Sequence, residues 1–445
     1  KMKDFENALL VSKSGELKNF NERDRVLFLN AEILYGLERY DESIDSFNEI
    51  LKKYPDSKLS DDSLYNIAYA YKESGKYESA AEFFLVYFKD GMDLGKRQKA
   101  LYNVILMNMK LSQTQSAIQY SQLFLDSFED GDLREKVLFR LGSLFSDLKN
   151  YNKAVEAYRI FVDKYSSSER LDEAYFLLGY NLQLADKNAE ALSAYEKVGK
   201  KDYKGLYLSA LKNRAIICFA LNKEDDAALI YRQIINEMPD CDLEIGAYIW
   251  LAKYYSNNKR YNDALVILNA VETREDASAH IAEIGYFKGE VYRYTKQYEL
   301  AVESYNLVVS NAEKQVYAGA SHIGKGLCLI ELAKLDEAKV EFETAILENA
   351  DDNTIAMRSR FELANITFKK GEFEEAAKLY MLVAILYDDK DYGPRSLFRA
   401  GESFRSDGRL SEAEKAFKEL VVRFKKHELV KEANLALADI ENKKV

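Results

Sequence analysis

A small residue that returns every 36 to 38 positions is the feature of this sequence that most constrains its fold. It occupies eleven equivalent places: Ser43, Ala80, Ala117, Ala154, Ala191, Ala227, Ala264, Ala301, Ala338, Ala376 and Ala413. Eight of the ten steps between neighbours are 37 residues long. So regular a spacing is typical of a repeat array, in which one supersecondary unit is stacked many times.

Residues 138–161 show what the repeated unit is. Apolar or small residues lie three and four positions apart on both sides of a turn at Lys149 and Asn150: Leu138, Leu141, Gly142 and Phe145 before it, and Tyr151, Ala154, Tyr158 and Phe161 after it. This spacing places each set on one face of a helix. The turn is too short for anything but an antiparallel helical hairpin.

Two further positions confirm the repeat. The place of Gly142, here called the crossing position, is small in ten repeats of eleven: Ala31, Ala68, Gly142, Gly179, Ala215, Ala252, Gly289, Gly326, Ala364 and Gly401, with Ile105 as the exception. The place of Tyr158, the wedge position, is aromatic in nine: Phe47, Phe84, Tyr158, Tyr195, Tyr231, Tyr305, Phe342, Tyr380 and Phe417, with Ser121 and Leu268 as exceptions. Small residues let two helices cross closely, and a ring fills the wedge beside the crossing.

The unit formed by these positions resembles the tetratricopeptide repeat (TPR), and the pattern covers residues 24–426. The resemblance implies an all-helical, right-handed α-solenoid of about eleven helix-turn-helix repeats. The usual period of the family is about 34 residues, and the longer period here resembles the repeats of its bacterial cell-envelope branch. Residues 54–57, which read Tyr-Pro-Asp-Ser, resemble the end of such a unit.

The domain organisation follows from the repeats. Residues 1–20 match only the second helix of a repeat, residues 21–428 hold eleven repeats as one continuous superhelix, and residues 429–445 form a capping helix and tail. We therefore expect 24 helices and no strand. Repeats four and five are regular, whereas Ile105 and Ser121 predict a looser helix crossing in repeat three.

Composition argues against several classes of function. The formal charge of −11 disfavours a nucleic-acid partner, because affinity for nucleic acid comes from neutralising phosphates. No apolar run approaches the roughly 18 residues that a membrane span needs. The three cysteines are too few and too scattered for a disulfide framework, and Cys218 and Cys328 are interpreted as buried apolar residues.

Enzymatic motifs are weak. The three histidines lie far apart in the sequence, and no His or Cys pair has the spacing of metal ligands. Residues 319–326 approach a phosphate-binding loop, but Lys325 is not followed by Ser or Thr and no strand precedes the segment. The chain is therefore expected not to be an enzyme and to hold no cofactor or metal.

The place of Phe139, the groove position, carries the functional hypothesis. The resemblance implies that first helices line a concave groove and that this position faces the groove or its rim. The eleven residues there are Phe28, Tyr65, Tyr102, Phe139, Phe176, Lys212, Ile249, Tyr286, Ile323, Phe361 and Phe398. All but Lys212, Ile249 and Ile323 are aromatic. The rings either anchor a partner segment or pack against the preceding repeat, and both readings stay open. In the first case Tyr65, Tyr102, Phe139 and Phe176 should remain partly exposed. Tyr69 and Tyr180 complete the candidate groove.

A site for a partner's carboxylate was tested against the family pattern. Relatives with a carboxylate clamp use Lys and Asn in one repeat, Asn in the next, and Lys and Arg in a third. Asn103, Lys136 and Arg140 match the last two parts, but Tyr65 and Tyr69 occupy the first. The resemblance therefore implies a looser anion site at Asn103, Lys136 and Arg140 rather than a full clamp.

These observations predict a non-catalytic scaffold or adaptor that binds a segment of a partner protein along its concave groove, in assembly of a bacterial envelope complex. The alternative is a regulatory TPR array cut from a longer polypeptide with a catalytic domain upstream. The compartment would be periplasmic or envelope-associated if a signal has been removed, and otherwise cytoplasmic. The sequence upstream of Lys1 would separate these hypotheses.

Overall fold

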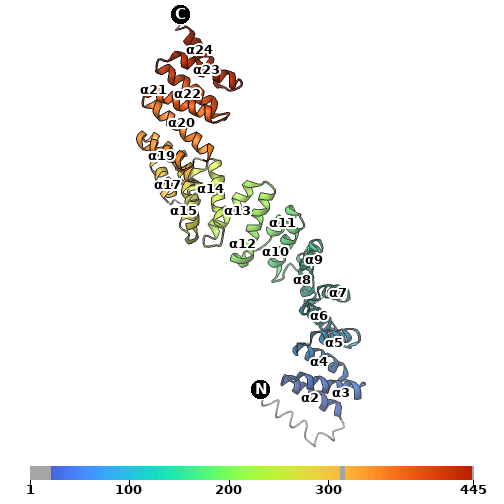
Figure 1. The fold of residues 1–445 in the computed structure, drawn as a ribbon. Helices are drawn as coiled ribbons and strands as arrows, with labels where there is room; N and C mark the ends of the chain where they lie inside the picture. Colours follow the sequence, from blue (N-terminus) through green and yellow to red (C-terminus); the bar gives the residue numbers. More distant parts are fainter. Residues whose placement is uncertain (1–21, 130, 311–315, 350, 443–445) are drawn as a thin grey trace. The chain divides into compact units, whose positions relative to one another are not determined.

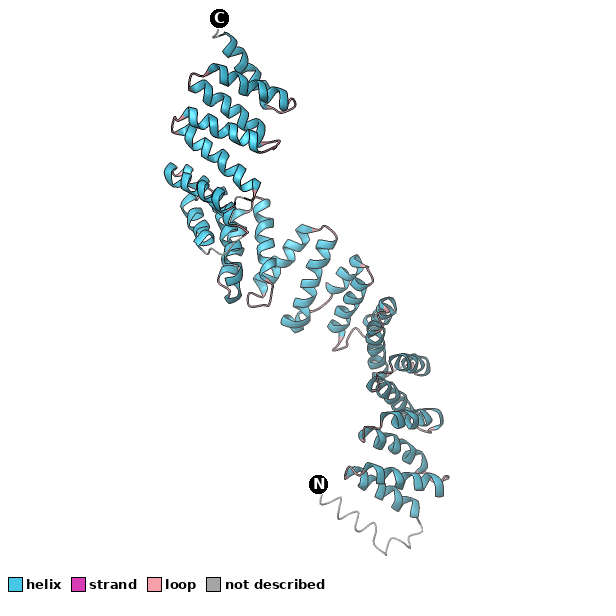
Figure 2. Ribbon diagram, viewed as in Figure 1, coloured by secondary structure: helices cyan, strands magenta, loops and turns pink. Residues whose placement is uncertain are grey.

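The computed structural model describes residues 22–129, 131–310, 316–349 and 351–442. These residues contain 23 α-helices, α2 to α24, and no strand (Figures 1 and 2). Of the 24 helices expected, the one assigned to residues 1–20 lies outside the described residues, and the other 23 are present. The all-α class is confirmed.

The chain divides into two compact units, of which the first is Lys1–Pro239. Its described helices are α2 (Arg23–Gly36), α3 (Tyr40–Lys53), α4 (Ser60–Glu73), α5 (Tyr77–Asp90), α6 (Leu94–Lys110), α7 (Thr114–Ser127), α8 (Asp132–Asp147), α9 (Tyr151–Lys164), α10 (Leu171–Leu184), α11 (Asn188–Tyr195), α12 (Leu208–Ala220) and α13 (Glu224–Glu237). Even-numbered helices are the first helices of each pair and odd-numbered helices are the second. Each first helix packs on its own second helix, and each second helix packs on the first helix that follows within the unit.

The second unit, Asp240–Val445, repeats this arrangement. Its helices are α14 (Ile245–Asn257), α15 (Tyr261–Glu272), α16 (Ile281–Tyr294), α17 (Tyr298–Ser310), α18 (Ala318–Glu331), α19 (Leu335–Glu348), α20 (Asn353–Lys369), α21 (Phe373–Leu386), α22 (Tyr392–Ser406), α23 (Leu410–Arg423) and α24 (Leu429–Asn442). Helix α24 packs on α22 and α23 and buries Ala433, Ala436 and Ile440. The single continuous superhelix concerns how the two units are joined and stays a prediction.

The hairpin turns repeat one backbone conformation. Each of the eleven turns has one residue with φ between 55° and 80°: Glu38, Gly75, Ser112, Lys149, Asp186, Asn222, Lys259, Lys296, Ala333, Gly371 and Gly408. In the first turn, the backbone N–H of Arg39 donates to the carbonyl of Leu34 and that of Glu38 donates to Tyr35, both at 2.9 Å. This is the Schellman pattern that ends a helix through a left-handed residue. Its recurrence confirms the repeat spacing.

The packing of the helix pairs agrees with the three sequence positions. All eleven small residues at the start of the second helices are fully buried. A Cβ atom built on Gly142 would lie 2.7 Å from Cζ of Tyr158, and one built on Gly326 would lie 2.7 Å from Cζ of Phe342. Those distances are too short for any side chain, so the ring of the second helix rests directly on the glycine of the first.

In repeat three, the large residue is at the crossing position and the small residue is at the wedge position. Ile105 stands at the crossing position and Ser121 at the wedge position, and both are fully buried. The Ser121 hydroxyl donates to the carbonyl of Ala117 at 2.7 Å, which satisfies it without a partner on another helix. Both positions therefore stay buried although the small and the large residue are exchanged between the two helices. The expected lower stability of this repeat stays a prediction.

Repeat five is not regular, contrary to expectation. Its second helix α11 has 8 residues where α9 has 14. The chain then forms a 3-10 turn at Lys200–Asp202 and a π turn at Tyr203–Tyr207. After the end of α11, the backbone N–H of Gly199 donates to Oδ1 of Asp172 at 2.9 Å. The irregular segment lies within the one short step of the repeat, between Ala191 and Ala227.

Candidate protein-binding surface

The candidate groove residues all lie on first helices of the first unit. Phe28 lies on α2, Tyr65 and Tyr69 on α4, Tyr102 and Asn103 on α6, Lys136, Phe139 and Arg140 on α8, and Phe176 and Tyr180 on α10. Helices α4, α6 and α8 also touch one another in succession. A surface built from one helix can therefore continue onto the next.

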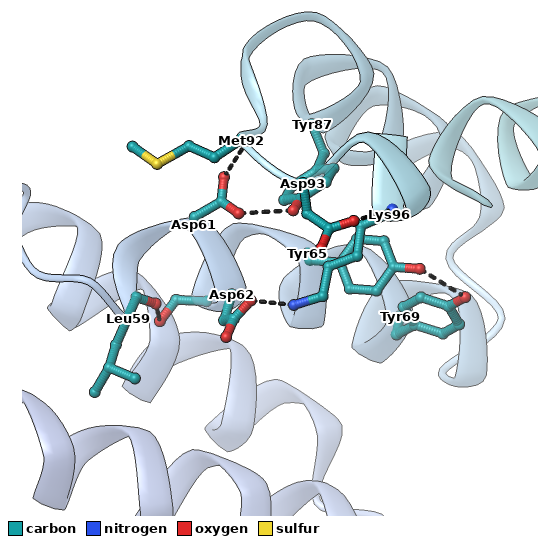
Figure 3. A network of polar contacts seen from close by, with 10 residues as sticks. Leu59, Asp61, Asp62, Tyr65, Tyr69, Tyr87, Met92, Asp93 and Lys96 are labelled. Carbon is teal, nitrogen blue, oxygen red and sulfur yellow. Dashed lines mark hydrogen bonds and ion pairs between the residues drawn. The ribbon is translucent and has the colours of Figure 1, made fainter. Parts of the chain in front are cut away.

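Two tyrosines and an asparagine join α4 to α6. The hydroxyls of Tyr65 and Tyr69 lie 3.3 Å apart (Figure 3), and Nδ2 of Asn103 donates to the Tyr69 hydroxyl at 3.2 Å. The Nζ atom of Lys96 lies 5.6 Å from the centre of the Tyr65 ring, within cation–π range. Burial raises the pKa of Tyr65, so its hydroxyl stays neutral. Both rings are half-buried and are held in place by these contacts.

Acidic residues at the start of α4 bind both its own second helix α5 and the first helix α6 of the next repeat. Oδ2 of Asp61 accepts a hydrogen bond from the Tyr87 hydroxyl at 2.7 Å, and its Oδ1 accepts one from the backbone N–H of Met92 at 3.0 Å. Asp62 pairs with Lys96 at the start of α6, as Figure 3 shows. Sequence analysis missed this network, although two aspartates in a first helical turn are a visible signal.

A second contact joins α6 to α8. Nε of Arg140 donates to the Tyr102 hydroxyl at 3.3 Å, and both side chains are partly exposed. Asn103 is buried, and its amide hydrogens donate to Tyr69 and to the carbonyl of Lys99. Among the described residues, no hydrogen bond joins Asn103 to Lys136 or Arg140. The structure thus places Asn103 with the tyrosines and leaves Lys136 and Arg140 as the cationic groups of the predicted anion site.

Phe139 does not remain accessible, and that expectation was wrong. Its side chain is only 4% exposed, and its ring packs edge-to-face on Phe161 at 5.3 Å between centroids. On another side the guanidinium of Arg170 lies 3.4 Å from the ring centre. Arg170 is itself held by a two-pronged contact to Glu173, at 2.9 and 3.1 Å. A residue of the next repeat therefore covers this ring, and the accessible row is interrupted at α8.

The other rings divide between packing and exposure. Phe28 is half-buried and packs on Phe47 at 5.3 Å, and Phe176 is half-buried and packs on Tyr195 at 5.6 Å. Tyr180 is exposed. The two readings of the groove position therefore coexist in the first unit, where Phe139 is buried and the rings of Phe28 and Phe176 stay partly exposed.

The second unit has a different first-helix surface. A hollow of about 590 Å³ is lined by residues of α16, α18, α20 and α22, together with Lys296 in the turn after α16 and Tyr298 of α17. At the groove position of this unit, Ile249, Ile323 and Phe361 are buried, whereas Tyr286 and Phe398 are half-buried. Sequence analysis did not predict the hollow.

The weak enzymatic motifs have structural explanations. Residues 319–326 lie within helix α18, and Nζ of Lys325 pairs with Oε1 of Glu341 at 2.7 Å. All three cysteines are buried and free, and burial raises the pKa of Cys328 to about 12. Within the described residues, no group of three His, Cys, Asp or Glu side chains could hold a metal ion. None of the described helices is long and apolar enough to cross a membrane.

The stacked helix pairs define a helical-repeat protein. Tetratricopeptide repeat models match residues 28–92, 136–168, 282–315 and 395–427, in both units. The chain therefore contains tetratricopeptide repeats in both units, which supports a protein-interaction scaffold. None of the matched models describes an enzyme.

Solved structures with similar helical repeats share little sequence with this chain. A TPR protein described as having an unusual peptide-binding site, YrrB, is 19% identical over 47% of this chain and 99% of its own, with a TM-score of 0.36. Yeast Tom70 is 16% identical over 90% of this chain and 99% of its own, with a TM-score of 0.35. Naa15/Naa10 bound to HypK-THB is 14% identical over 98% of this chain and 72% of its own, with a TM-score of 0.39. No curated protein sequence matches the chain.

Proposed function

We propose that this scaffold binds a segment of a partner protein along the first-helix face of α4, α6 and α8. The observation that carries the proposal is the set of half-exposed tyrosines, Tyr65, Tyr69 and Tyr102, each held by a hydrogen bond to a neighbour. A tyrosine offers a large apolar surface and a polar tip, and such residues dominate the energy of protein interfaces. Rings already fixed in orientation lose little entropy on binding.

The surface suggests a polarity for the bound segment. Apolar side chains of the partner would rest on the tyrosine rings of α4 and α6. Lys136 is exposed and lies one helical turn before Arg140, so a carboxylate of the partner would be placed at the α8 edge. Phe139 contributes to packing in this arrangement and makes no direct contact with the partner.

The test compares one double variant with one single control variant in a pull-down from the source organism. Tyr65→Ala with Tyr102→Ala should remove two anchors worth on the order of 1 to 4 kcal/mol each and release the partner. Tyr120→Ala is the matched control, because Tyr120 is a half-buried tyrosine on the second helix α7. Retention of every partner by the double variant, with unchanged helix content, would move recognition away from this face.

We further propose the bacterial envelope as the place of action, on the strength of the long repeat period and the loop at residues 54–57. In the structure, the Ser57 hydroxyl of this loop donates to Asp24 of the same repeat at 2.6 Å. Fractionation of cells that produce the full-length protein tests the compartment. A catalytic domain encoded upstream of Lys1 would instead favour the regulatory array.

A further inference from the structure

The hollow of the second unit is lined by four consecutive first helices. Helix α16 touches α18, α18 touches α20, and α20 touches α22, so the lining is continuous. Four cationic side chains line it, Arg293, Lys296, Lys369 and Arg399. The two carboxyl groups in the lining are Glu331 and Glu362. This concentration of positive charge stands in a chain whose formal charge is −11.

Most of these cations have no carboxylate partner of their own. Arg293 is held by Glu290, with contacts of 3.2 and 2.8 Å. In contrast, no carboxylate of the described residues lies within 4.0 Å of the charged nitrogens of Lys296, Lys369 or Arg399. The Arg399 guanidinium lies 4.7 Å from the ring centre of Phe368, which fixes it without neutralising it. Three cations therefore remain for an external anion.

One of the two carboxyl groups in the hollow, that of Glu362, is half-buried. Burial raises the pKa of Glu362, against the opposing effects of the Asn365 hydrogen bond and of Arg395, Arg358 and Lys369. The amide of Asn365 donates to Oε2 of Glu362 at 2.9 Å. The lining thus has four cationic groups against two carboxyl groups, one of which has a raised pKa.

The lining also has an apolar part that suits a peptide better than a small ion. Leu327 and Ile330 of α18 line the hollow together with the cations of α16, α20 and α22. A volume of about 590 Å³ holds several side chains, whereas a single phosphate would leave most of it unfilled. The hollow therefore offers cations for carboxylates and an apolar surface for a neighbouring side chain.

We propose that this hollow is a second binding site, which takes an acidic segment of a partner protein with an apolar residue among its Asp and Glu side chains. This proposal rests on the function proposed above, because both take the partner to be a protein. The second site lies in the other unit, is formed by other residues and binds a segment that is acidic. Lys369 and Arg399 bind the carboxylates, and Leu327 and Ile330 contact the apolar side chain.

A random twelve-residue peptide library displayed on phage tests the proposal against the whole immobilised chain. Peptides selected on the wild type should be enriched in Asp and Glu next to an apolar residue. Lys369→Glu with Arg399→Glu should remove the enrichment and weaken selected peptides at least tenfold. The matched control is Lys378→Glu with Lys415→Glu, which makes the same charge change on exposed residues of α21 and α23 and should keep the enrichment.

Three results would overturn the proposal: no acidic enrichment on the wild type, equal enrichment on the Lys369→Glu, Arg399→Glu variant, or full displacement of the selected peptides by inorganic phosphate at equal concentration. The last would reassign the hollow to a free anion. Selection on Tyr65→Ala with Tyr102→Ala separates the two proposals. If the first-unit face binds nothing, that variant should still select acidic peptides through the second unit.

Discussion

The two units use the same positions of the same repeat to present different chemistry. Two residues before the crossing position, the first unit has Asn103 and Arg140, whereas the second has Glu362 and Arg399. One residue after it, Tyr69 in α4 corresponds to Asn365 in α20. In the first unit these side chains fix half-exposed tyrosines, and in the second they line a cationic hollow.

This difference shows at which positions packing restricts the residue type. Crossing and wedge residues such as Gly142 with Tyr158 and Gly326 with Phe342 are buried against each other, so packing fixes their size in both units. On the first-helix face, Arg140, Glu362 and Arg399 are partly exposed, and packing leaves the charge at such positions free to vary. Recognition can therefore differ between repeats while the scaffold stays the same.

The largest expected effect concerns the shared scaffold. Tyr158→Ala in the first unit and Phe342→Ala in the second should each cost about 3 to 5 kcal/mol of unfolding free energy, because each empties a fully buried wedge. Denaturant unfolding followed by circular dichroism measures both. If one unit tolerated the change, the two scaffolds would not be equivalent.

The control for this comparison is Tyr158→Phe. The Tyr158 hydroxyl is buried and has no hydrogen-bond partner among the described residues. Removing it should leave stability unchanged or raise it by up to about 1 kcal/mol. A loss comparable to that of Tyr158→Ala would mean that the hydroxyl, and not the ring, stabilises the wedge.

The second prediction tests the exchange of sizes in repeat three. Ile105→Gly should cost about 2 to 5 kcal/mol through the cavity it leaves, and Ser121→Tyr about 1 to 3 kcal/mol through overpacking. Together they recreate the Gly–Tyr pair of repeat four, so the double variant should be more stable than the two single effects predict. A coupling of at least about 1 kcal/mol in the double-mutant cycle is expected. Additive effects would show that the two sites do not compensate each other.

Most of the scaffold was predictable from the sequence because its determinants recur at one spacing. The small residues, crossing residues and rings identified the helix pairs, and the left-handed turn residues follow the same step. The shortened α11 was not predicted; just beyond its end, the backbone N–H of Gly199 donates to Asp172 of the preceding helix, a contact that the repeat spacing does not show.

The candidate site was harder to predict because it depends on which side chains cover one another. Phe139 has the same place in its repeat as Tyr102, but Arg170 of the next repeat lies over its ring. The cationic hollow depends on which charges lack a partner, and sequence spacing does not show this for Lys369 or Arg399. The residue types at the groove position predicted which helix face carries the candidate site. Only the contacts of each side chain determine which rings and charges on that face are accessible.

The third prediction sharpens the contrast between Glu362 and Asn103. The folded-state pKa of Glu362 is raised, so the folded chain holds this proton more tightly than the unfolded chain. The resulting stability is fully present below the unfolded-state pKa and is lost as pH rises through the raised value. Glu362→Gln should therefore raise Tm at pH 7, with the gain disappearing below about pH 4. Asn103→Asp, which places a carboxyl group at the equivalent buried position, should lower Tm at pH 7. An equal Tm gain for Glu362→Gln at both pH values would exclude ionisation as its cause.

The smallest expected effect separates stability from binding at one residue. Lys296 lines the cationic hollow and also adopts the left-handed turn conformation, with φ of 60°. Lys259 has φ of 58° in the turn between α14 and α15, and it does not line the hollow. A side chain costs about 1 kcal/mol in this conformation, and glycine does not incur that cost. Either residue changed to glycine should therefore raise the unfolding free energy by up to about 1 kcal/mol, as measured by denaturant unfolding.

Only Lys296→Gly should also weaken binding of the acidic peptides selected on the wild type, because only Lys296 supplies charge to the hollow. If Lys259→Gly weakened them equally, the effect would come from the turn and Lys296 would have no part in the site.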